Sequence, residues 1–281
     1  GEGASLPPRK PDPMAPAEIA EPIEPRAPID VIKVGGHELD DPAFVAGLAM
    51  AVAGLHALGR AVVVVHGGGR AIGDLQAKLG LDVRVVDGLR ATDDAGMDVV
   101  EMVLSGLANK RLVAAFLAAG HDAMGLSGVD RGLIRCRRLA HASPDLGRVG
   151  EVTAVRAEVL RALLDTGVVP IVSPVALGED GRSWNVNAET AAAAVATATG
   201  AARLLLVSNV PGVRLGGGIA PRLDDVAIES AIAAGDIQGG MVPKVRAALT
   251  AVAAGVVEAR VVDLAGLADG GGTAIVGHAG P

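Results

Sequence analysis

From residue 29 onward the chain alternates between short, uninterrupted apolar runs and longer amphipathic stretches. A short apolar run bounded by turn residues is typical of a buried strand, whereas apolar positions three and four apart favour a helix. The pattern predicts strands at 30–34, 61–66, 122–126, 167–173, 203–208, 258–263 and 273–276. It predicts helices at 41–58, 70–79, 156–165, 187–199, 225–234 and 243–254, a long amphipathic run from Thr92 or Asp93 to Gly120, and a hairpin-type excursion over 131–138 and 149–155.

Strands of this kind, alternating with helices, predict an α/β fold. We expect a three-layer α-β-α sandwich around a mostly parallel open sheet, with helices on both faces. Start and stop signals mark the first helix: Asp41 precedes Pro42, which suits the first helical position, and Gly59 follows the last apolar turn. Ligands of such sheets bind beyond the carboxyl ends of the strands, so the loops after the strands are the candidate sites.

The first 28 residues have a different composition, with prolines at 7, 8, 11, 13, 16, 22, 25 and 28. Proline donates no backbone hydrogen bond and does not sustain a long helix. We therefore expect a flexible extension over 1–28. The rest of the chain is predicted to form one continuous α/β domain in two lobes, 29–183 and 184–281.

Composition narrows the function classes. The 281 residues carry a net charge of −7, with no tyrosine, two phenylalanines and one tryptophan. Scattered basic residues and so few aromatic platforms argue against nucleic-acid binding. A single cysteine, Cys136, excludes an internal disulfide framework. No apolar run reaches the length of a membrane span and no signal-peptide block is present, so we expect a cytoplasmic protein without a membrane partner.

Two of the predicted strands run straight into glycines. Residues 30–36 read Asp-Val-Ile-Lys-Val-Gly-Gly and residues 61–69 read Ala-Val-Val-Val-Val-His-Gly-Gly-Gly. Such loops let the backbone approach a ligand closely and point N–H groups at negative charge, and Lys33 adds a full positive charge. Glycines that merely form tight turns are the alternative, but two loops and a lysine favour phosphate chemistry.

A second cluster, Trp-Asn-Val-Asn-Ala-Glu-Thr at 184–190, precedes an alanine-rich helix. If that helix begins near Asn185, then Asn185 and Glu189 are neighbours on one face near its amino end. An asparagine cap and a glutamate that complements the helix dipole would produce the same pattern without a function. The cluster alone leaves both interpretations open.

Two cations stand out in the remaining loops. Lys244 follows Gly239, Gly240 and Pro243 in the first turn of a predicted helix, where a cation is unfavourable unless an anion joins it. A solvated lysine without a role is the alternative. Arg90, in Gly-Leu-Arg-Ala-Thr at 88–92, is suited to bidentate pairing with a carboxylate.

In their order along the chain these motifs resemble the amino acid kinase family. The resemblance covers residues 30–276 and, within the family, is greatest to members that phosphorylate N-acetyl-L-glutamate. Beyond the loops above it includes Gly-Leu-Ala-Asn-Lys at 106–110, Gly-Leu-Ser-Gly at 125–128, Val-Ser-Asn-Val-Pro-Gly-Val at 207–213 and Gly-Met-Val-Pro-Lys at 240–244. The chain has no Walker-type Gly-x-x-x-x-Gly-Lys-Ser/Thr, so it is not expected to be a P-loop enzyme.

The resemblance implies an enzyme that transfers the phosphoryl group of ATP to the γ-carboxylate of N-acetyl-L-glutamate, in arginine biosynthesis. Catalytic roles fall on Lys33 and Lys244, with Glu189 orienting both lysines. The implied acyl-substrate contacts, in the lobe 29–183 and at its border, are Gly68, Gly69, Arg90 and Asn185. The implied nucleotide contacts are Gly35, Gly36, Asn209, Val210, Pro211, Gly212, Val213, Arg214, Asp236, Ile237 and Gln238. Mg²⁺ is expected to be held mainly by ATP oxygens, with no protein metal site.

Two positions depart from the family pattern. Glu189 and Asn209 both stand where aspartate is usual, so one side chain is a methylene longer and the other lacks a charge. A displacement of about 1 Å can cost about a hundredfold in rate. Alternatives are therefore a kinase of a related, aminoadipate-type acyl amino acid and a catalytically weakened ligand-binding homologue. A kinase that makes carbamoyl or aspartyl phosphate is disfavoured by Arg90.

Other conspicuous residues receive structural interpretations. His66 ends a buried strand, and the reaction needs no base because the attacking carboxylate is already ionised at neutral pH. Cys136 lies among arginines, but nothing in the sequence suggests a nucleophile, so a nucleophilic role is not expected. Trp184 either walls the substrate pocket or covers a loop. The proline-rich extension does not resemble the N-terminal helix of the hexameric, arginine-inhibited members, so we expect a homodimer without arginine feedback.

Overall fold

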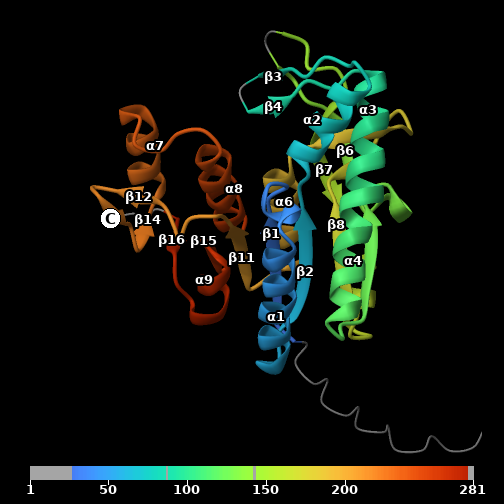
Figure 1. The fold of residues 1–281 in the computed structure, drawn as a ribbon. Coiled ribbons are helices and arrows are strands. Elements are labelled where there is room, and N and C mark those ends of the chain that lie inside the picture. The colour runs from blue at the N-terminus through green and yellow to red at the C-terminus, as the bar shows by residue number, and fades with distance from the viewer. Residues whose placement is uncertain (1–26, 87, 142–143, 278–281) are drawn as a thin grey trace, which may run out of the picture.

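The computed structural model describes residues 27–86, 88–141 and 144–277, so nearly all of the predicted extension over 1–28 lies outside the described residues. Its main sheet holds eight strands in the order β14-β16-β15-β11-β1-β2-β8-β5 (Figure 1). Their bounds are β1 Ile29–Val34, β2 Ala61–His66, β5 Ala123–Ser127, β8 Val169–Ser173, β11 Arg203–Val207, β14 Arg222–Leu223, β15 Glu258–Val262 and β16 Thr273–Ile275.

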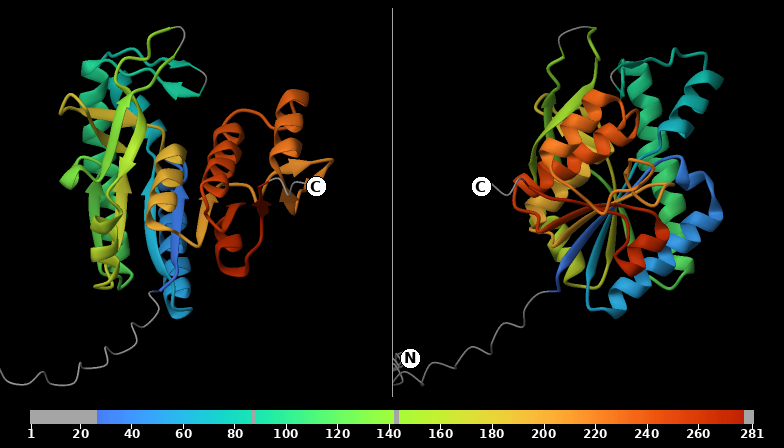
Figure 2. Two further views of the ribbon diagram at one scale, coloured as in Figure 1. Left: turned by 180° about the vertical axis from the view of Figure 1, so that it is seen from behind. Right: turned by 90° about the vertical axis from the view of Figure 1, so that its left-hand side faces the viewer.

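Neighbouring strands of this sheet are parallel except β15 and β16, which are antiparallel. The helices are α1 Pro42–Ala57, α2 Gly69–Lys78, α3 Asp94–Glu101, α4 Asn109–Ala118, α5 Ala157–Leu164, α6 Ala188–Thr199, α7 Asp225–Ala234, α8 Met241–Ala253 and α9 Leu264–Asp269. Helices lie on both faces of the sheet (Figure 2). The predicted fold class, a three-layer sandwich around a mostly parallel sheet, is confirmed. The lobe boundary after residue 183 stays a prediction.

Each face of the sheet has its own core because strand side chains alternate between faces. In β1, Ile32 and Val34 pack with α1, α4 and α9, and this core includes the fully buried Phe116 of α4. Val31 points to the other face, where it packs with α5, α6 and α8. Small alanine side chains along α6 let that helix approach β1 and α8 closely.

Beyond the carboxyl ends of the main strands lie smaller elements. Four strands, β6 Ile134–Arg138, β7 Val149–Val155, β9 Val175–Gly178 and β10 Ser183–Val186, form a closed sheet, and the short strands β3 Val85–Val86 and β4 Leu89–Arg90 form a hairpin. A second small pair joins β12 Arg214–Leu215 to β13 Gly218–Ile219. Helices α2 and α3 share a third hydrophobic core near β9. In Figure 1 the β3–β4 hairpin, α2 and α3 lie above β1 and β2, whereas β12 lies beside α7.

Local sequence signals explain most of the element ends. The Asp41 side chain accepts a hydrogen bond from the Ala43 N–H at 2.9 Å, Pro42 occupies the first helical position, and Gly59 has a φ of +72° beyond the end of α1. The long amphipathic run begins at the Asp93 cap. It consists of α3, a π-helical segment over Met102–Ala108, and α4. The predicted hairpin is confirmed as antiparallel β6 and β7.

One local prediction is wrong. Asn185 does not begin a helix: it lies in β10, which pairs with β7 and β9. Helix α6 starts at Ala188, and its cap is Asn187, whose side chain accepts a hydrogen bond from the Thr190 N–H at 2.9 Å. Asn185 and Glu189 are therefore not neighbours on one helical face. Pairing with β9, across a short turn, and with the more distant β7 keeps residues 183–186 extended.

Among the described residues, no helix combines the length and the apolar character that a membrane crossing requires.

Candidate functional site

Two lysines and one carboxylate meet at the carboxyl end of the central strand. Lys33 projects from β1, Glu189 from the first turn of α6 and Lys244 from the fourth position of α8. Lys33 Nζ lies 2.6 Å and Lys244 Nζ lies 3.9 Å from the same oxygen, Glu189 Oε1. The longer glutamate side chain thus reaches both lysines. Segments about 55 to 211 residues apart in sequence converge on this cluster.

The cluster is largely buried, and its negative charge lies beside two positive charges. Lys33 is 3% exposed and Glu189 is 9% exposed. Burial alone raises the pKa of Glu189, but the charges of Lys33 and Lys244 and the Lys33 hydrogen bond outweigh it, so the pKa lies below its ordinary value. Burial and the Lys33 charge lower the pKa of Lys244, against the opposing effects of Glu189 and Glu38. By formal charge the cluster keeps one excess positive charge, which favours an anionic ligand.

The two glycine loops touch each other next to this cluster. A Cβ on Gly36 would collide with the backbone of Gly68 and Gly69, and the Gly67 N–H donates to the Val34 carbonyl at 3.0 Å. A Cβ on Gly68 would lie 2.6 Å from Leu104 Cδ2. Because these glycines have no side chains, the two loops can approach each other closely. The sequence had indicated either ligand binding or tight turns for them, not this contact.

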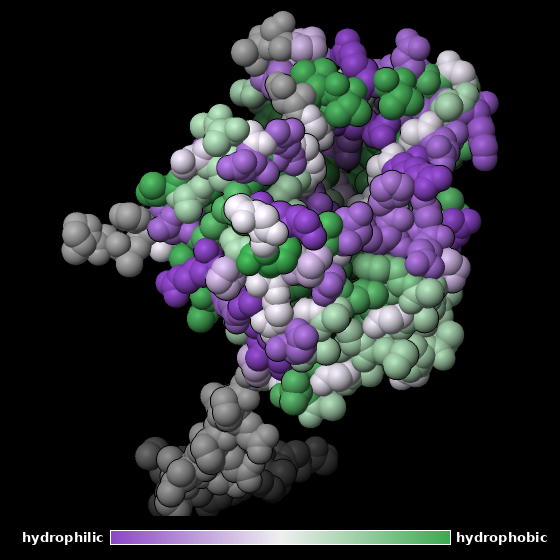
Figure 3. Space-filling model, turned by 60° about the vertical axis from the view of Figure 1, so that its left-hand side comes forward, coloured by the Kyte–Doolittle hydropathy of each residue, from purple (hydrophilic) through white to green (hydrophobic). Residues whose placement is uncertain are grey.

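A first pocket, about 220 Å³ in volume, opens on one side of the loops. The predicted acyl-substrate residues Gly68, Gly69, Arg90 and Asn185 all line it, together with Lys33 and Glu189. Its remaining walls are largely apolar and include Ile72, Leu104, Val149, Pro174 and Ala188. Figure 3 shows a hollow in the upper part of the molecule, with hydrophilic and hydrophobic residues around its rim.

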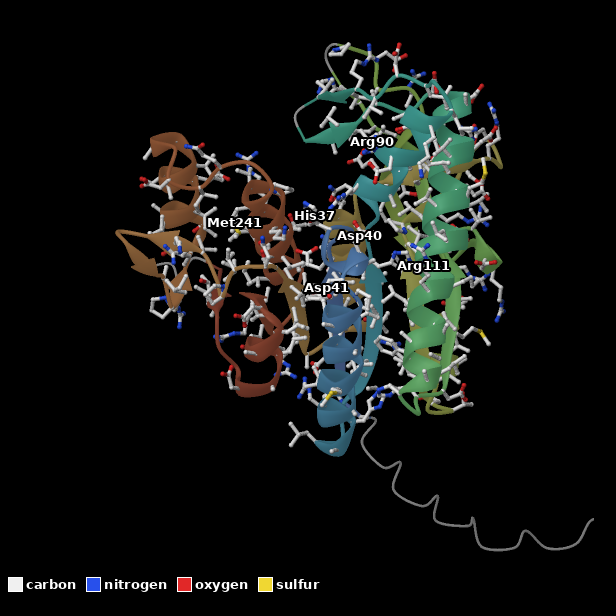
Figure 4. All side chains as sticks on the ribbon, viewed as in Figure 1. His37, Asp40, Asp41, Arg90, Arg111 and Met241 are labelled. Atoms are coloured by element: carbon white, nitrogen blue, oxygen red, sulfur yellow. The ribbon has the colours of Figure 1, made fainter. Side chains whose placement is uncertain are left out.

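Arg90 enters this pocket from β4, in the upper part of Figure 4. Its Nη1 donates to Gln76 Oε1 and its Nη2 to the Gly69 carbonyl, both at 2.7 Å. Burial lowers the pKa of its guanidinium. Asn185 Nδ2 donates to Thr92 Oγ1 at 3.1 Å, and Thr92 Oγ1 donates to the Arg90 carbonyl at 2.8 Å. The two predicted substrate ligands are thus tied together.

A second, larger pocket of about 780 Å³ opens on the other side of the lysines. Gly35, Gly36, Asn209 and Lys244 line it. The predicted nucleotide contacts of Gly35, Gly36 and Asn209 stay a prediction. Lys33, Gly36 and Glu189 line both pockets. The structure therefore has two adjoining pockets with the lysine-glutamate cluster between them.

The rest of the predicted nucleotide stretches do not line this second pocket. Val213 is buried and its N–H donates to Thr273 Oγ1 at 2.8 Å, while Gly212 packs against Thr273 so closely that a Cβ would not fit. Ile237 is buried in the core, whereas Pro211, Arg214, Asp236 and Gln238 are exposed and Val210 is half-buried. Nucleotide contacts over 210–214 and 236–238 stay a prediction.

Several lining residues were not predicted. The unpredicted residues that line the second pocket are His37, Glu38, Asp41, Phe44, Ser208, Asp263, Leu264 and Ala265. Figure 4 labels His37 and Asp41 beside the start of α1. Most of these residues follow the carboxyl ends of β1, β11 or β15, so the rule that located the glycine loops would also have found them. Gln76, which holds Arg90, has no such signal.

The structural interpretations of two residues agree with the geometry. His66 is fully buried, with Nδ1 3.0 Å from the Gly67 carbonyl and Nε2 3.1 Å from Asn109 Nδ2. Desolvation lowers its pKa to about 4, so the ring is neutral at pH 7. Cys136 is buried, and burial raises the pKa of its thiol to about 11, which makes a thiolate nucleophile unfavourable. Trp184 Nε1 donates to Asp180 Oδ1 at 2.9 Å, so it covers the loop between β9 and β10.

Fold and site together are those of an α/β kinase that acts on a small molecule. The chain belongs to the amino acid kinase family: the model of this family matches residues 29–263. The membership in this family that the sequence motifs predicted is confirmed.

Individual relatives agree with the family assignment. The chain is 55% identical over 248 residues to a protein named acetylglutamate kinase from Roseiflexus sp. strain RS-1, covering 88% of this chain and 94% of the relative. It is 52% identical to a protein of the same name from Chloroflexus aurantiacus strain J-10-fl, covering 86% and 95%. The crystal structure of smu.665 from Streptococcus mutans UA159 is similar, with a TM-score of 0.76, 30% identity, and coverage of 88% and 98%.

Proposed function

We propose that this protein transfers the γ-phosphoryl group of ATP to the γ-carboxylate of N-acetyl-L-glutamate, giving ADP and an acyl phosphate in arginine biosynthesis. The observation that carries the proposal is the pair of adjoining pockets that share Lys33, Gly36 and Glu189. Two relatives named acetylglutamate kinase, 52% and 55% identical over most of the chain, support the choice of acceptor.

In the proposed reaction, an acceptor carboxylate oxygen bonds to the γ-phosphorus and the bond from that phosphorus to the bridging oxygen breaks. The electron pair stays on ADP, and no proton has to move. Lys33 and Lys244 are placed to neutralise the charge of the transferring group, because both converge on one point between the pockets. Glu189 holds both lysines in place and keeps their spacing fixed.

The first pocket has the chemistry of a small dicarboxylate. Arg90 offers a guanidinium for the α-carboxylate, Asn185 offers an amide, and the N–H groups around Gly68 and Gly69 open α2, where partial positive charge favours an anion. Apolar walls such as Leu104 and Pro174 suit the acetyl group and methylenes. With the α-carboxylate at Arg90, we expect the γ-carboxylate to lie nearest Lys33, which lines the same pocket.

The second pocket suits a nucleotide phosphate chain. Lys33 and Lys244 add positive charge to this pocket, which Gly35, Gly36 and Asn209 also line. Nucleoside contacts over 210–214 and 236–238 belong to the same proposal. Among the described residues, no three His, Cys, Asp or Glu side chains are grouped to hold a metal ion. We propose that Mg²⁺ enters bound to ATP, because oxygen atoms of the phosphate chain are ligands that it prefers.

A panel of acceptors tests the proposal. The purified chain is incubated with ATP, Mg²⁺ and hydroxylamine, which traps an acyl phosphate as a hydroxamate. We expect hydroxamate with N-acetyl-L-glutamate, and much less with N-acetyl-L-aspartate, L-aspartate or carbamate. Product only with N-acetyl-L-aminoadipate would move the assignment to a kinase of that longer acceptor. Absence of product with every acceptor, despite ligand binding, would support the weakened homologue.

The proposal extends to assembly. We propose a homodimer that arginine does not inhibit, and light scattering of the purified chain checks the dimer directly. A hexamer, or inhibition by arginine at low concentration, would contradict this part. The cytoplasmic location and the absence of a nucleic-acid partner remain predictions from the sequence.

A further inference from the structure

Arg90 has an unusual set of partners for a half-buried cation. Both acceptors of its guanidinium are neutral: the side-chain oxygen of Gln76 and the carbonyl of Gly69, each at 2.7 Å. Among the residues that the structure describes, no carboxylate forms an ion pair with Arg90. Within that part of the chain, its positive charge is therefore oriented by neutral groups and paired with no carboxylate.

One face of α2 provides this orientation. Residues 69, 73 and 76 are spaced at i, i+4 and i+7, so they lie along one side of the helix. Gly73 sits between the two hydrogen-bonding positions, and a Cβ there would lie 3.6 Å from Arg90 Nη2. The guanidinium thus lies against a strip of helix without side chains, and Gln76 closes the end of that strip.

Gln76 is itself almost fully buried, with 2% of its surface exposed. A buried amide is costly unless it is hydrogen-bonded, so its bond to Arg90 is expected to be well occupied. A glutamate at this position would make the same hydrogen bond but would cancel the charge of Arg90. An amide oxygen fixes the guanidinium and leaves its charge for an incoming anion.

Thr92 extends the arrangement to the second predicted ligand. It is 1% exposed, and its hydroxyl joins the Arg90 carbonyl at 2.8 Å to Asn185 Nδ2 at 3.1 Å. With this amide hydrogen engaged, Asn185 Oδ1 stays available toward the pocket that Asn185 lines. Two buried polar side chains, Gln76 and Thr92, therefore hold the two groups that face one end of the pocket.

We propose that Gln76 is a positioning residue for carboxylate recognition: it orients Arg90 through a neutral hydrogen bond, so that the charge of the guanidinium is available to the α-carboxylate of the acceptor. This inference rests on the proposed function, because it concerns the acceptor end of the same pocket. Thr92 has the same positioning role for Asn185.

Binding measurements with charge-matched variants test this role. Gln76→Glu adds a negative charge with almost no change in shape, Gln76→Met removes the hydrogen bond, and Ala77→Glu adds the same charge to an exposed neighbour on α2 as a control. Calorimetry measures the Kd of N-acetyl-L-glutamate, of its α-carboxamide analogue and of ADP, each alone. Thermal melting checks that each variant is folded.

We expect Gln76→Glu to raise the Kd of N-acetyl-L-glutamate by about 10- to 100-fold, the range for loss of a charged hydrogen-bonding partner. Its Kd for ADP should stay unchanged, and its preference for the carboxylate over the carboxamide should shrink toward unity. Gln76→Met should show a smaller rise, about 3- to 10-fold, and keep the preference. Ala77→Glu should behave as the unmodified chain.

Two results would overturn the inference while leaving the proposed function intact. One is a Gln76→Glu variant that binds N-acetyl-L-glutamate as tightly as the unmodified chain. The other is an equal loss of ADP binding, which would indicate a general structural defect. If the unmodified chain binds no N-acetyl-L-glutamate, the proposed function fails and this inference fails with it.

Discussion

A substitution of Glu189 tests the proposed role of the lysine-glutamate cluster in phosphoryl transfer. Its Oε1 lies 2.6 Å from Lys33 Nζ and 3.9 Å from Lys244 Nζ. Glu189→Asp removes one methylene and withdraws the carboxylate by about 1.5 Å, the length of one C–C bond. The separation from Lys33 then increases to about 4 Å unless α6 moves.

The longer distance in Glu189→Asp weakens the attraction between residue 189 and Lys33. With an effective dielectric constant of about 20, the attraction between unit charges falls from about 6 to about 4 kcal/mol when their separation grows in this way. A loss of about 2 kcal/mol in lysine positioning corresponds to about a 30-fold lower rate if it is felt in the transition state. We therefore expect Glu189→Asp to lower kcat by about 30- to 100-fold, with little change in either KM.

The assay compares this variant with Glu189→Gln, which retains a hydrogen-bond acceptor for Lys33 but loses the charge. Breaking a buried ion pair costs about 3–5 kcal/mol of stability, so Glu189→Gln should also melt at a lower temperature. Steady-state release of ADP gives kcat and KM, and calorimetry gives the melting temperature. A Glu189→Asp variant as active as the unmodified chain, or more active, would refute this reasoning and favour the weakened homologue.

The other predictions concern the glycine loop after β2 and the histidine before it. Gly69→Ala places its Cβ where no protein atom lies within 4 Å, so stability should hold while the KM of the acceptor rises several-fold; an unchanged KM would remove Gly69 from the acceptor site. Gly68→Ala meets Leu104 Cδ2 at 2.6 Å and should cost about 1–3 kcal/mol in unfolding experiments, which makes it the steric comparison. His66 has a folded pKa of about 4, below its unfolded value of 6.5, so the unfolded chain takes up the proton first and stability falls as the pH drops between these values. The loss should reach about 3 kcal/mol by pH 4, and denaturation of His66→Gln across this range should lack that component.

The sequence predicted those parts of the fold that local signals decide. Asp41 and Pro42 start α1 through a side-chain cap and a fixed φ, and the unbroken apolar run over 61–65 favours a buried strand at β2. Strand β10 was missed because its four residues, Ser-Trp-Asn-Val, form no apolar run; pairing with the adjacent β9 and with β7 keeps them extended. Helix α9 was missed because it has only six residues.

Some residues of the site could likewise be predicted from local sequence signals, and others could not. Lys33 and the two glycine loops were predictable because each follows a buried strand, and parallel strands bring such loops to one edge of the sheet. Lys244 was noticed because a cation in a first helical turn is locally unfavourable. Gln76 gave no signal, because an amphipathic helix does not reveal which polar side chain it buries.

In the proposed function, the phosphoryl group moves from one pocket to the other and is stabilised by Lys33 between them. A rapid-quench, single-turnover measurement of Lys33→Met tests it most directly, at saturating ATP and N-acetyl-L-glutamate and after calorimetry has established the binding of each. We predict that both ligands still bind while the transfer step slows by at least about a hundredfold, as for loss of one charge-stabilising donor. Transfer at a rate within a few-fold of the unmodified chain would contradict it.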